Sequence, residues 1–329
     1  MIGYSHILIW IIPIVQSIAT LFSQEATDGG VSSLLFILQP KQNCLETIAD
    51  LKGPNKNMAA LWLRATFHHA GTWDKISKTG GADASIMYFL TDEDNLGLEE
   101  SIAPKFMANR NITMTKADMI VLGGQISVTH CGGPEMQFRP GRIDAKPPKI
   151  TSPKGRIPTP EQKLDVIKNR MYSMGFDDAD IVALITGSHT LGGVHSFNSP
   201  KVTNESFIPF DDTPGIFDNH VFKFALKGQC ALKIDCDIAS DPALRPIVQK
   251  FANSQQEFFK QYQISFPKMN DLTISKLHEP QKLDIPSHDG LYDVVQPPTK
   301  FSTLQSNNGI QLSLEILQYL VGLQFLFLL

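Results

Sequence analysis

Three residues in the segment LWLRATFHHA (residues 61–70) have side chains that could do chemistry together. Arg64, Phe67 and His68 are spaced i, i+3 and i+4, so on a helix all three would project from one face. A histidine can move a proton near neutral pH, and an arginine can stabilise negative charge that develops during a reaction. Because a histidine beside an arginine is often purely structural, this pattern needs a second signal.

A second histidine, His189, lies in the segment ALITGSHTLG (residues 183–192). It follows an apolar stretch, and its small neighbours Gly187 and Ser188 would let a flat ligand approach closely. Neutral imidazole is a usual axial ligand of haem iron. Taken alone, however, this segment is better explained by a buried histidine that is hydrogen-bonded in the core.

The elements that position these residues are predicted to be helices. Apolar residues at helical spacing, bounded by capping or turn residues, predict helices over 58–70, 117–128, 160–174, 177–189, 219–227 and 243–262. Thr159 and Asp177 should cap the third and fourth of these helices. Alternating strand patterns are scarce. We therefore expect a mainly α fold with little β-structure.

In combination, Arg64-x-x-Phe67-His68 and the segment around His189 resemble the distal and proximal helices of the plant, fungal and bacterial haem peroxidase superfamily. The resemblance extends through much of residues 58–272. The segment AGTWD (70–74) is similar to the intracellular class of ascorbate and cytochrome c peroxidases. In contrast, GGADASI (80–86) and PFDDTPGIFD (209–218) are similar to the secreted fungal class. This mixture implies a fungal type between the classes, with two helical halves sandwiching one haem b.

The resemblance implies a role for each residue of the site. His68 would take a proton from bound hydrogen peroxide and return it to the leaving oxygen, while Arg64 would stabilise charge as the O–O bond breaks. Asn95 would hold His68 in the required tautomer. His189 would ligate the haem iron, and Asp235 would accept its other ring N–H and raise its basicity.

The implied activity is that of a peroxidase which reduces hydrogen peroxide and oxidises small, phenol-like donors in one-electron steps through a ferryl haem. The aromatic neighbours of the haem would be Phe67 on the distal side and Phe210 on the proximal side. The surface tryptophan of lignin-type enzymes falls at about Leu184. The manganese-binding positions of the fungal class hold no acidic residue here; they are Asn57, Leu61 and His195.

The resemblance also implies bound calcium. Oxygen atoms that suit calcium would form a proximal site; they come from Thr190, Asp211, Thr213, Ile216 (through its carbonyl) and Asp218. A distal site would use Gly81, Asp83 and Ser85. His69 stands where the fungal class has an aspartate, so this second site lacks one carboxylate. We therefore expect one calcium ion on the proximal side.

Both ends of the sequence have the pattern of processing signals. Residues 7–15 are an apolar run followed by small and polar residues, which is typical of a secretory signal peptide cleaved after Ala19 or Ser23. Small residues at 306–309 precede an apolar tail, in the order of a glycosylphosphatidylinositol (GPI) anchor signal. An amphipathic helix packed on the domain is the alternative for this tail. The expected division is a signal peptide (1–23), a peroxidase domain (24–300) and a C-terminal tail (301–329).

Export would also suit the cysteines and the glycosylation motifs. Four cysteines allow three pairings, of which we expect Cys44–Cys131 with Cys230–Cys236. Asn111 and Asn204 lie in N-x-S/T motifs, so the chain would be a glycoprotein if they are exposed.

The composition narrows the function classes. The chain has 329 residues, of which 42% are hydrophobic and 19% charged, and its net charge is −4. Since no basic field is present, nucleic-acid binding is not expected. We expect a secreted or surface-anchored monomer that acts in the response to oxidative stress. The alternatives are an exported haem-binding or redox-sensing protein without efficient turnover, a helical adhesion domain, and a peroxidase whose donor is ascorbate or a protein.

Overall fold

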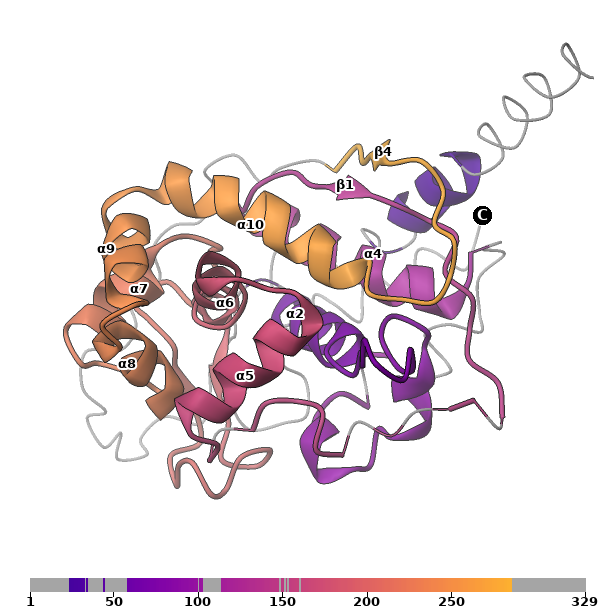
Figure 1. Cartoon of the computed structure of the whole chain (residues 1–329). Helices are drawn as coiled ribbons and strands as arrows, with labels where there is room; N and C mark the ends of the chain where they lie inside the picture. The colour runs from indigo at the N-terminus through magenta and orange to yellow at the C-terminus, as the bar shows by residue number, and fades with distance from the viewer. Residues whose placement is uncertain are drawn as a thin grey trace, which may run out of the picture. The chain divides into compact units, whose positions relative to one another are not determined.

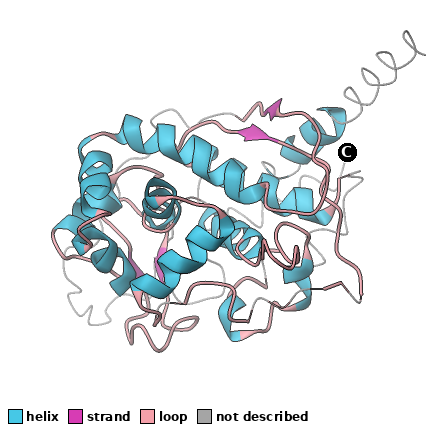
Figure 2. Cartoon of the chain, viewed as in Figure 1, coloured by secondary structure: helices cyan, strands magenta, loops and turns pink. Residues whose placement is uncertain are grey.

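The computed structural model describes residues 24–32, 34, 44, 58–99, 101–102, 114–147, 149–150, 152, 154–159 and 161–285. Within these ranges the chain is mostly helical, as expected (Figure 1, Figure 2). The predicted signal peptide, the C-terminal tail and the Asn111 motif lie outside the described residues. No helix among the described residues is long and apolar enough to cross a membrane.

The helices are named here as in Figure 1. They are α2 (Met58–Ala70), α4 (Lys116–His130), α5 (Leu164–Met174), α6 (Asp178–Leu184), α7 (His220–Leu226), α8 (Lys233–Ser240), α9 (Arg245–Asn253) and α10 (Gln255–Asn270). Short 3₁₀ turns cover Ser85–Tyr88, Glu93–Asn95 and Gly187–Thr190. Strands β1 (Gln137–Phe138) and β4 (Gln281–Lys282) pair antiparallel, as do β2 (Gly193–Val194) and β3 (Ile208–Pro209).

Helix α2 has the predicted bounds, but three other predicted helices were placed wrongly. Helix α5 begins only at Leu164; at Thr159 there is instead a turn, in which the Thr159 N–H donates to the Gln162 side chain. Asp177 does cap α6 through a capping box, yet this helix ends at Leu184 and leaves His189 on a separate turn. The helix expected over 243–262 is divided into α9 and α10 at Ser254, whose side chain caps α10.

The helix that carries Arg64 and His68 is fixed by close packing against α4. Trp62 and Thr66 of α2 face two glycines of α4, and a Cβ added at Gly124 would lie 2.3 Å from the Thr66 hydroxyl oxygen. The same hydroxyl donates to the Ile120 carbonyl at 2.7 Å. Because these groups are buried and paired, rotation of α2 about its axis would break contacts on the side away from Arg64 and His68.

The turn that carries His189 lies on a second layer of helices, α6, α7, α9 and α10, which shares one hydrophobic core with α2 and α4. An aromatic cluster forms its centre; its members are Phe217, Phe222, Phe251, Phe258, Tyr262 and Phe266, all fully buried. The Ser188 hydroxyl lies 2.9 Å from the Tyr262 hydroxyl, so the turn is hydrogen-bonded to α10.

Both layers meet directly at Gly192, just after this turn. Gly192 has a φ of +93°, and a Cβ added there would lie 2.8 Å from the Cβ of Ala60 in α2. A residue with a side chain would therefore be strained in its backbone and would also press against α2.

The two expected disulfides, Cys44–Cys131 and Cys230–Cys236, are present, and no cysteine is free. The first joins residue 44 to the residue that follows α4. The second closes a short loop at the start of α8.

Candidate active site

His68 is held in one orientation by Asn95. The Asn95 amide nitrogen donates to the Phe89 carbonyl at 2.9 Å, which turns its Oδ1 toward His68 Nδ1 at 3.0 Å. Since an amide oxygen only accepts, the proton of a neutral His68 ring belongs on Nδ1. The other ring nitrogen, Nε2, is then left with a lone pair that can accept a proton.

Arg64 is anchored by the same segment that holds His68. Its guanidinium donates to the Leu96 carbonyl at 2.7 Å and to the Asp94 carbonyl at 3.0 Å. The 3₁₀ turn over Glu93–Asn95 therefore positions both the cation and the base. Burial lowers the pKa of Arg64 to about 10, so the side chain remains charged at neutral pH.

The environment of His68 keeps it neutral. Burial, followed by the charge of Arg64, lowers the pKa of His68 from 6.5 to about 3, and the hydrogen bond with Asn95 only partly opposes this. Arg64, Phe67 and His68 nevertheless keep some accessible surface. Side chains that are largely buried but retain some accessible surface can contact a bound molecule.

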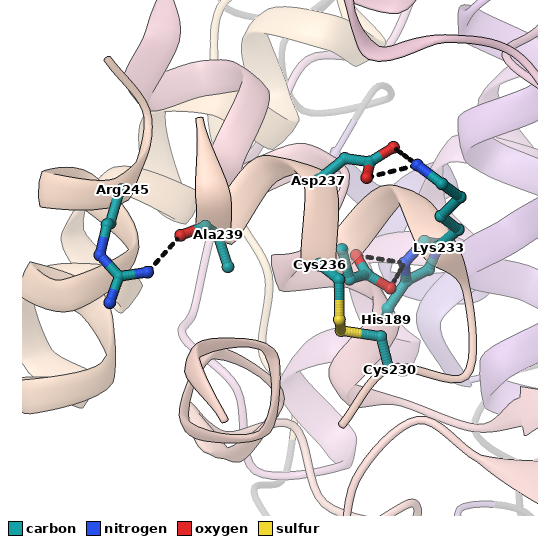
Figure 3. Close-up of a disulfide and its surroundings, with 8 residues drawn as sticks. His189, Cys230, Lys233, Cys236, Asp237, Ala239 and Arg245 are labelled. Atoms are coloured by element: carbon teal, nitrogen blue, oxygen red, sulfur yellow. Dashed lines mark hydrogen bonds and ion pairs between the residues drawn. A yellow bond between two sulfur atoms is a disulfide. The ribbon is translucent and has the colours of Figure 1, made fainter. Parts of the chain in front are cut away.

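His189, in the 3₁₀ turn that follows α6, is the second histidine held by a fixed partner. Its Nδ1 lies 3.0 Å from each carboxylate oxygen of Asp235, which belongs to α8 and whose side chain is only 3% exposed (Figure 3). The ring stacks on Phe210, with the centroids 4.6 Å apart. With Nδ1 engaged, Nε2 is available, and it is the nitrogen with which a histidine so oriented would bind a metal.

The proximal oxygen set is gathered as the sequence suggested. Thr190 and Thr213 each donate to both Asp211 and Asp218, at distances of 2.9 to 3.2 Å. Burial, together with the nearby charge of Asp218, raises the pKa of Asp211 to about 7. Ile216 lies in the same turn, where its N–H donates to the Thr213 carbonyl. Two buried carboxylates and two hydroxyls form a set that suits a hard cation.

The distal residues are also close together, and His69 contacts their loop. His69 Nε2 accepts the Ala84 N–H at 2.6 Å, so this imidazole holds the loop backbone and offers no hard oxygen ligand. The Ser85 N–H and hydroxyl both donate to Asp83 Oδ1. The loop that contains Gly81, Asp83 and Ser85 is therefore attached to α2, because the Ala84 N–H donates to His69. Among the residues that the structure describes, no group of three or more His, Cys, Asp or Glu residues could hold a metal ion.

His69 should make the folded protein sensitive to acid. Burial lowers the pKa of His69 from 6.5 to about 3, so the unfolded chain takes up this proton at a higher pH than the folded protein does. Stability is therefore lost as the pH falls through 6.5, and the loss grows until about pH 3. Between neutral pH and about pH 4.5, wild type should lose about 2 kcal/mol more unfolding free energy than His69→Gln. Urea unfolding of both proteins at the two pH values measures this, and equal losses would contradict it.

Three of the positions matched to specialised donor sites of the fungal class lie within the described residues, and all three are buried. Leu61 and His195 are each 8% exposed, and His195 lies against the Phe207 ring with the centroids 4.7 Å apart. Leu184 is fully buried, so it presents nothing at the surface. Asn57 lies outside the described residues.

A model of the peroxidase family matches residues 43–254, which include His68, Asn95, His189 and Asp235. L-ascorbate peroxidase 5, peroxisomal, of Arabidopsis thaliana is 35% identical over 225 residues, which are 66% of this chain and 77% of the relative.

Two further relatives are similar to the same extent. L-ascorbate peroxidase 3 of Arabidopsis thaliana is 35% identical over 228 residues, 66% of this chain and 75% of the relative. L-ascorbate peroxidase 1, cytosolic, of Oryza sativa subsp. japonica is 35% identical over 225 residues, 66% of this chain and 86% of the relative.

Proposed function

Because the chain belongs to the haem peroxidase superfamily and is therefore a peroxidase acting on hydrogen peroxide, we propose a class of electron donor for it. We propose that it oxidises small, phenol-like donors in one-electron steps. One observation supports the reaction with hydrogen peroxide on which this proposal depends. In both His68 and His189 the Nδ1 atom is engaged by a fixed partner, so Nε2 is left for reaction in the first and for iron in the second.

The residues present fit haem b. A neutral imidazole that donates to a buried carboxylate is a suitable iron ligand, and His189 with Asp235 has this arrangement. Phe210, stacked on the ring of His189, would limit its rotation. When bound, haem supplies the electrons that cleave the O–O bond of peroxide.

On the distal side, the chain would move one proton and stabilise charge. His68 Nε2 would take a proton from one oxygen of hydrogen peroxide and deliver it to the other oxygen, which leaves as water once haem has supplied the two electrons that cleave the O–O bond. Arg64 uses N–H groups beyond those bound to the Asp94 and Leu96 carbonyls to stabilise negative charge on the departing oxygen. Asn95 keeps the His68 proton on Nδ1 throughout.

Steady-state turnover of four donors tests the proposed substrate class. Guaiacol should be oxidised efficiently, and Mn(II) at least about tenfold less efficiently, because the positions 61 and 195 offer no carboxylate. Ascorbate is the second candidate donor, since the relatives reported above are named ascorbate peroxidases. Reduced cytochrome c completes the set. A Mn(II) rate that matches guaiacol would overturn the donor assignment, and a clear preference for ascorbate would replace it.

We also propose that calcium binds between Asp211 and Asp218, with Thr190, Thr213 and the Ile216 carbonyl. The support is the approach of two buried carboxylates, which a cation would relieve of their repulsion. Removing calcium with a chelator should lower Tm by several degrees, and added calcium should restore it. In Asp211→Asn the chelator should have little further effect. A wild-type Tm that is insensitive to chelator would contradict the site.

Export is proposed on separate grounds. Both disulfides, which are typical of oxidising compartments, and the exposed Asn204 motif support a secreted or cell-surface glycoprotein. The full proposal is a monomer with a cleaved signal peptide and a GPI anchor, although two of the relatives named above are described as a peroxisomal and a cytosolic protein. Cell fractionation with phospholipase C release distinguishes an anchored from a freely secreted product, and retention inside the cell would overturn both.

A further inference from the structure

Helix α8 has few local restraints where it carries Asp235. Leu232, the residue before the helix, makes no side-chain capping hydrogen bond. Asp235 is the third residue of α8, and its own N–H donates to the Leu232 carbonyl at 3.2 Å. The first turn of a helix whose amides lack a capping side chain is prone to fray.

A disulfide closes this first turn. Cys236, the neighbour of Asp235, is bonded to Cys230, six residues earlier in the chain (Figure 3). The residues before Cys230 are in turn fixed to the end of α7, because the Gly228 N–H donates to the Ala225 carbonyl and the Gln229 N–H to the Phe224 carbonyl, both at 3.0 Å. The disulfide thus links the turn bearing Asp235 to α7.

The disulfide acts on the side of α8 that the core does not hold. The core holds one face of the helix, which spans about 140° and consists of the buried residues Ile234, Asp235, Ile238 and Ala239. Cys236 lies about 200° around the helix from Ile234, and Asp235 lies between them at about 100°. Without the bond, the residue next to Asp235 would lose its covalent link to the segment at the end of α7, and the uncapped first turn could shift the Asp235 carboxylate relative to His189. The exposed Lys233–Asp237 ion pair runs along α8 itself and does not prevent this movement.

We propose that the Cys230–Cys236 disulfide is a positioning element of the proximal site, which sets the hydrogen bond between Asp235 and His189 and through it the electron density at the iron ligand. This inference rests on the proposed role of His189 as the iron ligand. A shorter, better aligned bond to a carboxylate makes the imidazole more basic, which strengthens its bond to iron and favours ferric over ferrous iron.

The test compares holoenzymes by two spectroscopic measurements that are independent of turnover. In Cys230→Ala/Cys236→Ala, the iron–histidine stretching band of the ferrous form should move to lower frequency, and the Fe(III)/Fe(II) reduction potential should rise. Asp235→Asn should shift the band and the potential in the same directions, and the shifts in the double variant should be smaller. The matched control is Cys44→Ala/Cys131→Ala, which opens a loop of sequence separation 87 instead of 6. The control should lose more thermal stability yet keep the wild-type band and potential.

Reduction of the wild-type holoenzyme gives the same comparison without substitution. Cys230 and Cys236 are half-buried whereas Cys44 and Cys131 are at most 1% exposed, so a water-soluble phosphine should reduce the former pair first. Mass spectrometry after alkylation identifies the opened pair, and reoxidation should restore the band. An unchanged band and potential after selective opening would overturn the inference, as would equal shifts in the control. If wild type shows no iron–histidine band, the proposed function itself fails, and the inference fails with it.

Discussion

Replacing His68 by leucine is expected to slow the reaction with hydrogen peroxide by about 10²–10⁴-fold, the usual contribution of a positioned acid–base group. The loss follows from the geometry, because Asn95 occupies Nδ1 and the one basic nitrogen that faces peroxide disappears. Leucine has a similar volume, so the pocket should keep its shape.

The rate is measured by stopped-flow absorbance after mixing with peroxide. The neighbouring residue supplies a matched control: His69→Gln changes a buried histidine of the same helix that contacts Ala84 instead of the site. At neutral pH this control should retain the rate within about threefold. Because the pKa of His68 is about 3, the wild-type rate should also stay flat between about pH 5 and 8. A His68→Leu enzyme that reacts at the wild-type rate would remove His68 from the mechanism.

Replacing His189 by alanine is expected to abolish the histidine-ligated haem spectrum and to lower turnover by more than about 100-fold. Loss of a residue that only hydrogen-bonds to a metal ligand costs up to about 100-fold, and loss of the ligand itself should cost more. The alanine would leave Asp235 buried without its partner, which adds a cost in stability. Exogenous imidazole should enter the space that the ring vacates and restore part of both signals.

The absorption spectrum of the reconstituted protein, before and after peroxide, measures this effect. His195→Ala serves as the control, since it removes a buried histidine six residues later whose ring is tilted against that of Phe207. That variant should keep the wild-type haem band. Should His189→Ala bind haem with an unchanged spectrum, another residue must ligate the iron.

Helix α2 and its reactive face were predictable because the signal is local. Spacing placed Arg64, Phe67 and His68 together, and Gly71 marked the end of the helix. The partners Asn95 and Asp235 lie 27 and 46 residues from their histidines. Nothing local marks these pairs, and only the resemblance to a known family suggested them before the structure placed them in contact.

Other contacts of the site cannot be predicted from the types of the residues involved. Arg64 is anchored by two backbone carbonyls, which every sequence possesses, so that contact could not be foreseen. The helix predicted through His189 ends at Leu184, because the following Thr186-Gly187 pair begins a separate turn that is set by packing on α10. His69 was identified only as a missing carboxylate, and its bond to the Ala84 amide depends on how the loop folds back.

The contact between Gly192 and Ala60 has an energetic consequence for cofactor capture. Protein atoms, and not the cofactor, set the separation of the two layers at this point, since a Cβ added at Gly192 would already press on the Ala60 Cβ of α2. The empty protein should therefore keep this separation, and little of the intrinsic affinity for haem is consumed in moving the layers apart. Preorganisation of this kind favours fast capture and high affinity, and it makes residue 192 a position where even one methyl group would weaken the affinity.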